Sequence, residues 1–205
     1  MKTRSAQSAK TLYLTQLAVL VVILLLLELT GLGFIRTPGL EFTIMTVPVI
    51  VGAIVLGPGA GAILGTVFGL TSFWQCVSGK SPFGATLLSI NPVGAFITTV
   101  PTRALMGLLC GLAFVLLRRV MKNRASQYAL SSLAGSLLNT VFFMGALVLF
   151  YYQTDFIQGF AKTLGSPNAV AFIFAFVGLQ GLLEAVICAF LGTVIVGALK
   201  KYIKP

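Results

Sequence analysis

Residues 17–27 read LAVLVVILLLL, and every residue in this run is Leu, Val, Ile or Ala. Apolar residues continue on both sides, so the pattern predicts a helix over residues 11–34, long enough to cross the roughly 30 Å hydrocarbon core of a bilayer. The run is too long for a cleaved secretion signal, and no clear cleavage site of small residues follows it. We therefore expect an integral membrane protein that retains this first helix.

Similar apolar stretches recur along the rest of the chain. The second is short, contains Pro48, and ends at the turn Gly57-Pro58-Gly59. In the third and fourth stretches glycines recur every fourth residue, a spacing that lets helix backbones approach closely in lipid. We expect an all-α membrane protein, a six-transmembrane-helix bundle that forms one domain over residues 1–205. The predicted helices after the first cover residues 42–56, 60–74, 93–117, 128–152 and 169–199.

The composition excludes several classes of function. Of the 205 residues 58% are hydrophobic and 9% charged, whereas soluble domains carry roughly 25% charged residues. The chain has no histidine, which removes His-based hydrolase triads and most zinc chemistry. Cys76, Cys110 and Cys188 are not paired in a CxxC motif, so we expect them to pack as small hydrophobic residues. No metal site and no cofactor within this chain are predicted.

The basic residues predict the orientation of the chain in the membrane. The net charge is +10, and the excess is concentrated at the chain ends and in one internal loop, where it would meet anionic lipid rather than nucleic acid. The positive-inside rule then places both termini in the cytoplasm of a multi-pass protein of the cell membrane. The predicted cytoplasmic side holds ten basic residues, Lys2, Arg4, Lys10, Arg118, Arg119, Lys122, Arg124, Lys200, Lys201 and Lys204.

Two charged residues fall deep within predicted helices and need a reason. Arg103 follows Pro101 in the fourth helix, and Glu184 lies near the middle of the sixth. A charge at the centre of a membrane helix costs about 2.5–3.5 kcal/mol on insertion scales. Arg103 is predicted either to bind a carboxylate or phosphate of a substrate through its guanidinium or to form a structural ion pair with Glu184.

Uncharged polar residues extend this candidate site. Asn139 lies in the middle of the fifth helix, and Gln180 precedes Glu184 by one helical turn. Trp74 and Asn91 flank the loop between the third and fourth helices, where an aromatic ring and an amide can orient a small polar ligand. We predict an outward-facing pocket between the last three helices, with Arg103, Asn139, Trp74, Asn91, Gln180 and Glu184 as its substrate-binding residues.

Four segments give the chain a family resemblance. They are FTIMTVPVIVGAIVLGP at 42–58, GLTSFW at 69–74, NPVGAF at 91–96 and PTRALMG at 101–107. Together they resemble the substrate-binding S components of energy-coupling factor (ECF) vitamin transporters, and within that family the chain is most similar to the pantothenate-specific type. The resemblance implies a subunit that captures a small water-soluble vitamin at the outer face and has no enzymatic activity.

The resemblance also implies partners. S components deliver their vitamin inward together with a transmembrane coupling protein and two cytoplasmic ATPases, which use ATP. This chain contains no Walker A motif of its own. In the family, small residues near the cytoplasmic end of the first helix dock on the coupling protein. The nearest match here is Thr11, Thr15 and Ala18, which departs from the usual alanine pattern.

The residues leave other functions open. Pantothenate has one carboxylate for Arg103, while hydroxymethylpyrimidine has none and folate has two together with a large pterin, and these arguments from chemical need do not decide among the vitamins. A purely structural membrane subunit without a ligand remains an alternative. A membrane enzyme acting on lipids would require clustered catalytic groups, and the sequence has no DxxD motif and no histidine.

Overall fold

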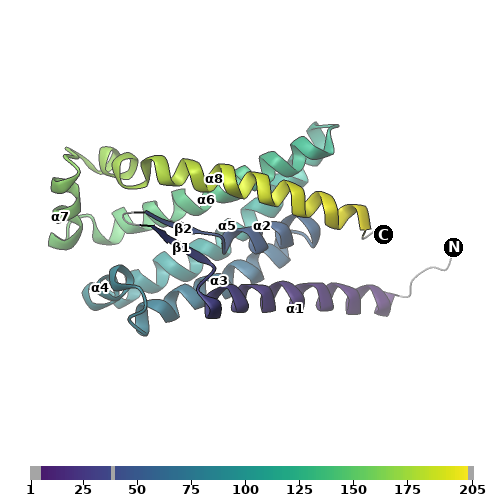
Figure 1. The fold of residues 1–205 in the computed structure, drawn as a ribbon, viewed down its shortest axis with the longest axis horizontal. Coiled ribbons are helices and arrows are strands. Elements are labelled where there is room, and N and C mark those ends of the chain that lie inside the picture. The colour runs from purple at the N-terminus through teal and green to yellow at the C-terminus, as the bar shows by residue number, and fades with distance from the viewer. Residues whose placement is uncertain (1–5, 38–39, 203–205) are drawn as a thin grey trace.

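The computed structural model describes residues 6–37 and 40–202, with only the backbone described for residues 6, 34–37, 40–42, 179, 180 and 202. The elements are α1 (Ala6–Thr30), β1 (Phe34–Thr37), β2 (Leu40–Thr43), α2 (Thr46–Val55), α3 (Pro58–Val77), α4 (Pro82–Ile90), α5 (Pro92–Val120), α6 (Arg124–Tyr151), α7 (Asp155–Thr163) and α8 (Ala169–Tyr202) (Figure 1).

Five of the helices are long and apolar enough to cross a membrane, namely α1, α3, α5, α6 and most of α8. α2 has only 10 residues, which at 1.5 Å per residue covers about half of the hydrocarbon thickness. The predicted second helix over residues 42–56 therefore begins too early, because residues 40–43 form β2. The bundle is confirmed, but the count of six spanning helices is not.

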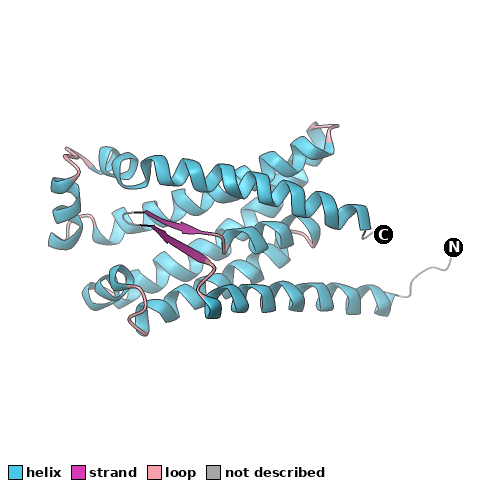
Figure 2. Cartoon of the chain, in the orientation of Figure 1, coloured by secondary structure: helices cyan, strands magenta, loops and turns pink. Residues whose placement is uncertain are grey.

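Three short elements lie at one end of the bundle, and the sequence patterns did not predict them. β1 and β2 form an antiparallel hairpin that pairs Phe34 with Thr43, drawn in magenta in Figure 2. α4 occupies part of the predicted loop between residues 75 and 92, and α7 occupies part of the predicted loop between residues 153 and 168. These elements cover the end of the bundle opposite to the start of α1 (Figure 1).

Local sequence signals explain why the helices begin where they do. α3, α4 and α5 each have proline in their first turn, where its fixed φ suits a helix and its missing N–H is not needed. The Ser81 side chain accepts a hydrogen bond from the Gly84 amide at 3.2 Å, and the Asn91 side chain accepts one from the Gly94 amide at 2.9 Å. These caps satisfy amides that helices leave unpaired at their N-termini.

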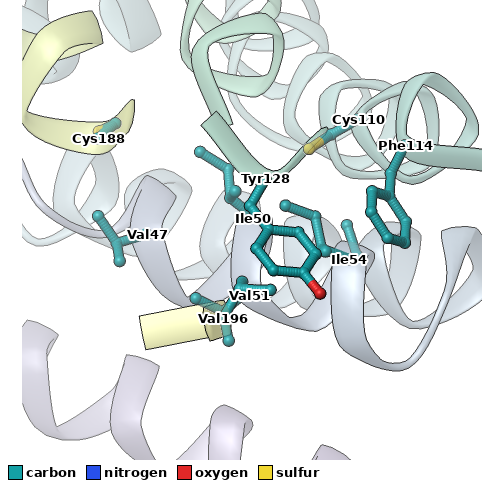
Figure 3. Close-up of a cluster of buried hydrophobic side chains, with 10 residues drawn as sticks. Val47, Ile50, Val51, Ile54, Cys110, Phe114, Tyr128, Cys188 and Val196 are labelled. Carbon is teal, nitrogen blue, oxygen red and sulfur yellow. The ribbon is translucent and has the colours of Figure 1, made fainter. Parts of the chain in front are cut away.

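The centre of the bundle is built around α2, in which every residue from 46 to 54 is buried. The side chains of Val47, Ile50, Val51 and Ile54 pack against residues of α5, α6 and α8 (Figure 3). Cys110 and Cys188 belong to this cluster as free, buried thiols, which confirms that they pack as small hydrophobic residues. A short helix without a polar face is stable here because neighbouring helices surround it.

α3 and α5 pack backbone against backbone. A Cβ atom added to Gly61 would lie 2.8 Å from the carbonyl carbon of Gly107, and one added to Gly65 would lie 2.8 Å from that of Arg103. Gly111 has the same relation to Pro58 at the end of the contact. We call this interface the glycine contact, and it confirms the predicted role of the glycine spacing in helix packing.

The basic residues gather at one end of the bundle. The start of α1, the end of α8 and the connection from α5 to α6 lie together at that end (Figure 1). The basic residues on these described segments are Lys10, Arg118, Arg119, Lys122, Arg124, Lys200 and Lys201. The cytoplasmic location of this end stays a prediction.

Candidate functional site

The guanidinium of Arg103 points back along α5 toward the N-terminal end of that helix. Its Nη1 donates hydrogen bonds to the carbonyl oxygens of Thr98 at 3.4 Å and Thr99 at 3.1 Å. Helical side chains lean toward the N-terminus, which accounts for the direction. Pro101 lies inside the helix and has no N–H to donate to the preceding turn. The preceding turn of α5 thus supplies carbonyl oxygens that hold Arg103 in position.

Two aromatic rings enclose the same guanidinium. Its central carbon lies 4.6 Å from the ring centroid of Phe68 in α3 and 5.8 Å from that of Phe143 in α6. Cation–π contacts of this kind stabilise a charge where water is scarce. The Nε of Arg103 is nevertheless enclosed without a hydrogen-bond partner among the described residues. The Nε–H group of Arg103 is therefore an unsatisfied donor within the described part of the chain.

Glu184 of α8 is buried, with 9% of its surface exposed, whereas Arg103 is only partly buried. The backbone amide of Thr43, at the end of β2, lies near its carboxylate. The Oε1 atom has no hydrogen-bond partner within the described residues. Glu184 and Arg103 do not form an ion pair, since no salt bridge joins these two described residues at the 4.0 Å limit. The ion pair that was one of the two predictions for Arg103 is thus not formed.

One face of α6 carries three polar residues and Phe143. Ser132, Ser136, Asn139 and Phe143 are spaced by four, three and four residues, which places them on one side of the helix. Phe143 contacts Arg103 of α5, and Ser132 packs against Gly192 of α8. Asn139 lies between these contacts and is only partly buried. Asn139 thus shares a face of α6 with Phe143, which contacts Arg103, and the grouping of Arg103, Asn139 and Glu184 in one site stays a prediction.

The helices around Arg103 and Glu184 carry several buried hydroxyl groups without a hydrogen-bond partner. In native structures most buried polar atoms have a hydrogen-bond partner, so each exception needs an explanation. We call Arg103, Asn139, Glu184 and these hydroxyls the polar interior. Within the described residues the buried hydroxyls without a partner on α3, α5 and α6 are those of Ser72, Thr98, Ser131, Ser132 and Ser136.

α8 is kinked beside the polar interior. Gly178 has φ 27° and ψ −123°, a conformation that residues with a side chain rarely adopt. The kink divides α8 into an apolar segment, Ala169–Gly178, and a longer one, Gly181–Lys201. Gln180 follows the kink, and its side chain lies outside the described residues. The kink therefore interrupts the backbone one to two turns before Glu184.

Two predicted site residues lie elsewhere. The Trp74 side chain is 61% exposed, on the side of α3 that faces away from Ser72 and Phe68. Asn91 caps α5 through its side-chain oxygen, and its carbonyl oxygen accepts a hydrogen bond from Tyr151 at 2.6 Å. The neighbour of Trp74, Gln75, is buried and donates to Glu28 of α1 at 2.6 Å. The structure thus does not bring Trp74 to Arg103, and it gives Asn91 a role in helix capping.

Several residues of the polar interior were not predicted. Phe68 and Phe143 are aromatic residues within apolar helices, and Ser72, Thr98 and Ser136 are common helix residues in membranes, so none of them stands out in the sequence. Thr43 reaches Glu184 only because the chain before α2 forms a hairpin. Only the spacing of Ser132, Ser136 and Asn139 on one helical face was available as a signal.

The outer face of α1 carries the residues predicted for docking. Thr11, Thr15 and Ala18 are all exposed. The hydroxyl groups of Thr11 and Thr15 donate to carbonyl oxygens one turn earlier in the helix, Gln7 at 3.0 Å and Thr11 at 2.9 Å. With their hydroxyls satisfied within α1, these residues present a small and largely apolar surface to the exterior of the bundle.

The long apolar helices define the class of this protein as a multi-pass membrane protein. Residues 12–196 match the family model described as "ECF transporter, substrate-specific component", and the chain belongs to this family. It is therefore a transporter component and not an enzyme.

Two curated relatives share the sequence over different lengths. The chain is 32% identical over 168 residues, 78% of each chain, to the "Pantothenic acid transporter PanT" of Lactococcus lactis subsp. cremoris. It is 37% identical over 97 residues, 45% of each chain, to the "Pantothenate transporter PanT" of Leuconostoc mesenteroides. The solved structure of ThiT from Listeria monocytogenes matches 96% of this chain and 100% of its own, with a TM-score of 0.66 and 15% identity. That likeness supports the S-component fold.

Proposed function

We propose that this protein is the pantothenate-binding subunit of an ECF-type importer. The observation that carries the proposal is Arg103, whose enclosed Nε has no partner and which forms no ion pair with the carboxylate of Glu184. A partly buried cation that forms no direct ion pair is costly in a membrane protein, and a substrate carboxylate would lower that cost. Both curated relatives carry the name of this vitamin, which supports the same assignment.

The other groups of pantothenate match the rest of the polar interior. Pantothenate carries two hydroxyl groups and an amide besides its carboxylate. The unpaired Oε1 of Glu184 accepts a hydrogen bond, and the side chain of Asn139 both donates and accepts. The unpaired hydroxyls of Thr98 and Ser136 act in both ways as well. An anionic ligand that also carries neutral donors and acceptors thus fits the polar interior better than a purely aromatic vitamin.

The carboxylate assignment is tested by combining a ligand change with a residue change. Panthenol replaces the carboxylate of pantothenate by an alcohol. Calorimetry on the detergent-purified protein is expected to show about 100-fold tighter binding of pantothenate than of panthenol, because a hydrogen bond between two charged groups contributes roughly 1.5–3 kcal/mol. In Arg103→Gln both ligands are expected to bind with the weak affinity of panthenol.

Control variants and ligands distinguish an error in the substrate assignment from an error in the family assignment. Arg103→Lys retains the charge but not the planar fork, and we expect it to recover only part of the preference for pantothenate. If Arg103→Gln lowers the affinities for pantothenate and panthenol by the same factor, Arg103 does not bind the carboxylate. If the folded protein instead binds hydroxymethylpyrimidine or folate and not pantothenate, the substrate assignment is wrong while the family assignment stands.

The transport cycle that we propose requires partners. The S component captures the vitamin at the outer face and delivers it inward with a transmembrane coupling protein and two ATPases that hydrolyse ATP. In this proposal both termini lie in the cytoplasm and the protein resides in the cell membrane. The accumulation of basic residues at one end of the bundle supports this orientation. The exposed small residues of α1 support docking through its outer face.

A substitution on α1 tests the docking surface. Ala18→Trp places a large ring among the exposed small residues of α1, and we expect it to abolish co-purification with the coupling protein while pantothenate binding is kept. Leu26→Trp provides the matched control. Leu26 lies closer to the other end of α1, and its side chain is 53% exposed. Equal co-purification of both variants with the coupling protein would exclude this face.

A further inference from the structure

Three basic side chains from three helices converge at the basic end of the bundle. The Lys200 Nζ lies 4.8 Å from the ring centroid of Phe114 and 6.0 Å from that of Tyr128. Arg118 follows Phe114 by one turn of α5, and Arg124 precedes Tyr128 by one turn of α6. Both guanidinium groups lie close enough to Lys200 to act on its charge. Lys200 therefore lies against two aromatic rings, with two further cations nearby.

No acidic side chain balances this group. The chain has four acidic residues, Glu28, Glu41, Asp155 and Glu184. Glu28, Glu41 and Asp155 belong to the last turn of α1, to β2 and to the start of α7, at the other end of the bundle. Glu184 precedes Lys200 by more than four turns of α8. Within the described part of the chain, the repulsion among the three cations has no internal counter-charge.

The helix dipoles explain only two of the three positions. Arg118 and Lys200 lie in the last turns of α5 and α8, where a cation is favourable. Arg124 is the first residue of α6, where the dipole instead favours an anion. An external anion at this position would interact favourably with the N-terminus of α6 and with all three side chains.

The backbone around the three cations is held in place by side chains. The connection between α5 and α6 is only three residues long. The side-chain amide of Gln127 donates a hydrogen bond to the carbonyl oxygen of Met121 at 2.7 Å. The side-chain oxygen of Asn123 accepts one from the backbone amide of Ala125 at 3.0 Å. On the face of α5 next to Arg118, the side chain of Val115 is 38% exposed, and that of Leu112, about one turn earlier, is 42% exposed. A fixed group of cations thus lies directly beside an apolar surface.

We propose that Arg118, Arg124 and Lys200 bind the phosphate headgroup of an anionic phospholipid, with its acyl chains along the exposed apolar face of α5. Basic pockets between membrane helices recognise such headgroups, and arginine binds phosphate through two parallel hydrogen bonds. The exposed arginines are accessible to the lipid. The site is distinct from the polar interior and does not depend on which vitamin the protein binds.

The experiment measures thermal unfolding of the full chain in neutral detergent with added phosphatidylglycerol, phosphatidylcholine or inorganic phosphate. We expect phosphatidylglycerol alone to raise the unfolding temperature, and native mass spectrometry to show one retained lipid. The triple variant Arg118→Gln, Arg124→Gln and Lys200→Gln is expected to lose this shift and to bind the lipid at least about tenfold more weakly. The control Lys10→Gln, Arg119→Gln and Lys122→Gln removes the same charge and is expected to keep both.

Three outcomes would contradict the proposal. Equal losses in the two triple variants would mean that net charge alone attracts the lipid. A similar temperature shift with inorganic phosphate would identify a free-phosphate site instead of a lipid site. If the triple site variant is poorly folded, lipid retention is measured instead on the single variant Arg124→Gln. Arg124 is chosen because the helix dipole of α6 does not favour a cation at its position. In a folded single variant, unchanged lipid retention would contradict the proposal.

Discussion

The glycine contact and the polar interior lie on neighbouring surfaces of α5 and follow opposite rules. At the glycine contact, Gly107 lies so near Gly61 of α3 that an added Cβ atom would be 2.6 Å from a backbone carbon. In the polar interior, the Arg103 Nε and the Glu184 Oε1 are enclosed without partners. One surface is packed by the protein itself, whereas the other contains polar atoms that the described residues leave without partners.

The difference shows how a bundle of this size combines stability with binding. Close backbone packing is a main source of helix association in lipid, where no hydrophobic effect drives helices together. The unpaired groups oppose stability, because each buried polar atom without a partner costs roughly 1–3 kcal/mol. We infer that the packing of α3 on α5 offsets the cost of the polar interior.

The largest effect is expected from changing the glycine contact. In Gly107→Ala the new methyl group meets the backbone of Gly61, which cannot move without displacing α3. Overpacking of this kind costs about 1–3 kcal/mol. We expect a marked fall in the unfolding temperature of the detergent-purified protein and less protein in the folded peak of a size-exclusion profile.

Gly145→Ala is the matched control within a helix. A Cβ atom at Gly145 of α6 would meet nothing within 4 Å, and alanine is favoured over glycine in a helix by about 1 kcal/mol. Unfolding temperatures are expected to rank Gly145→Ala at or above the parent protein, with Gly107→Ala well below it. If both variants unfold at the temperature of the parent, the glycine contact is not a source of stability.

A smaller effect is expected from neutralising the carboxylate of the polar interior. Glu184→Gln keeps the size of the side chain but weakens it as an acceptor for the substrate hydroxyls, so we expect about tenfold weaker pantothenate binding. Glu28→Gln changes a carboxylate that already accepts a hydrogen bond from Gln75. Calorimetry should find that this variant binds pantothenate with the affinity of the parent protein. If the two variants bind equally well, Glu184 does not contribute to the site.

The sequence predicts the long helices well because their signal is local. Apolar runs longer than 20 residues indicate a spanning helix, and α5 and α6 lie close to where such runs predict them. The helix starts are less well predicted: α6 begins at Arg124 rather than at residue 128, because the Asn123 side chain caps it. α7 was missed although Thr154 caps it and Asp155 begins it, since nine residues give too short a periodic pattern.

The polar interior is only partly predictable from the sequence. Arg103 and Glu184 stand out because a charge within a membrane helix is costly wherever it is placed. That the two would not form an ion pair depends on how far α5 lies from α8, which no local pattern determines. The kink at Gly178 is equally hidden, because the chain contains 22 glycines and nothing in the residues themselves distinguishes this one.

The smallest effect is expected from removing an unpaired hydroxyl, which tests whether that hydroxyl binds the ligand. Thr98 and Thr102 are both buried and lie one turn apart on α5. The Thr98 hydroxyl has no partner, whereas the Thr102 hydroxyl donates to the Thr98 carbonyl at 2.6 Å. Because Thr98→Val removes an unsatisfied group, we expect the empty protein to become more stable by up to about 1 kcal/mol while pantothenate binding weakens. Thr102→Val should lower stability by about 1 kcal/mol and leave the affinity unchanged. Thermal unfolding with and without pantothenate measures both quantities, and a Thr98→Val protein that gains stability without losing affinity would place this hydroxyl outside the binding site.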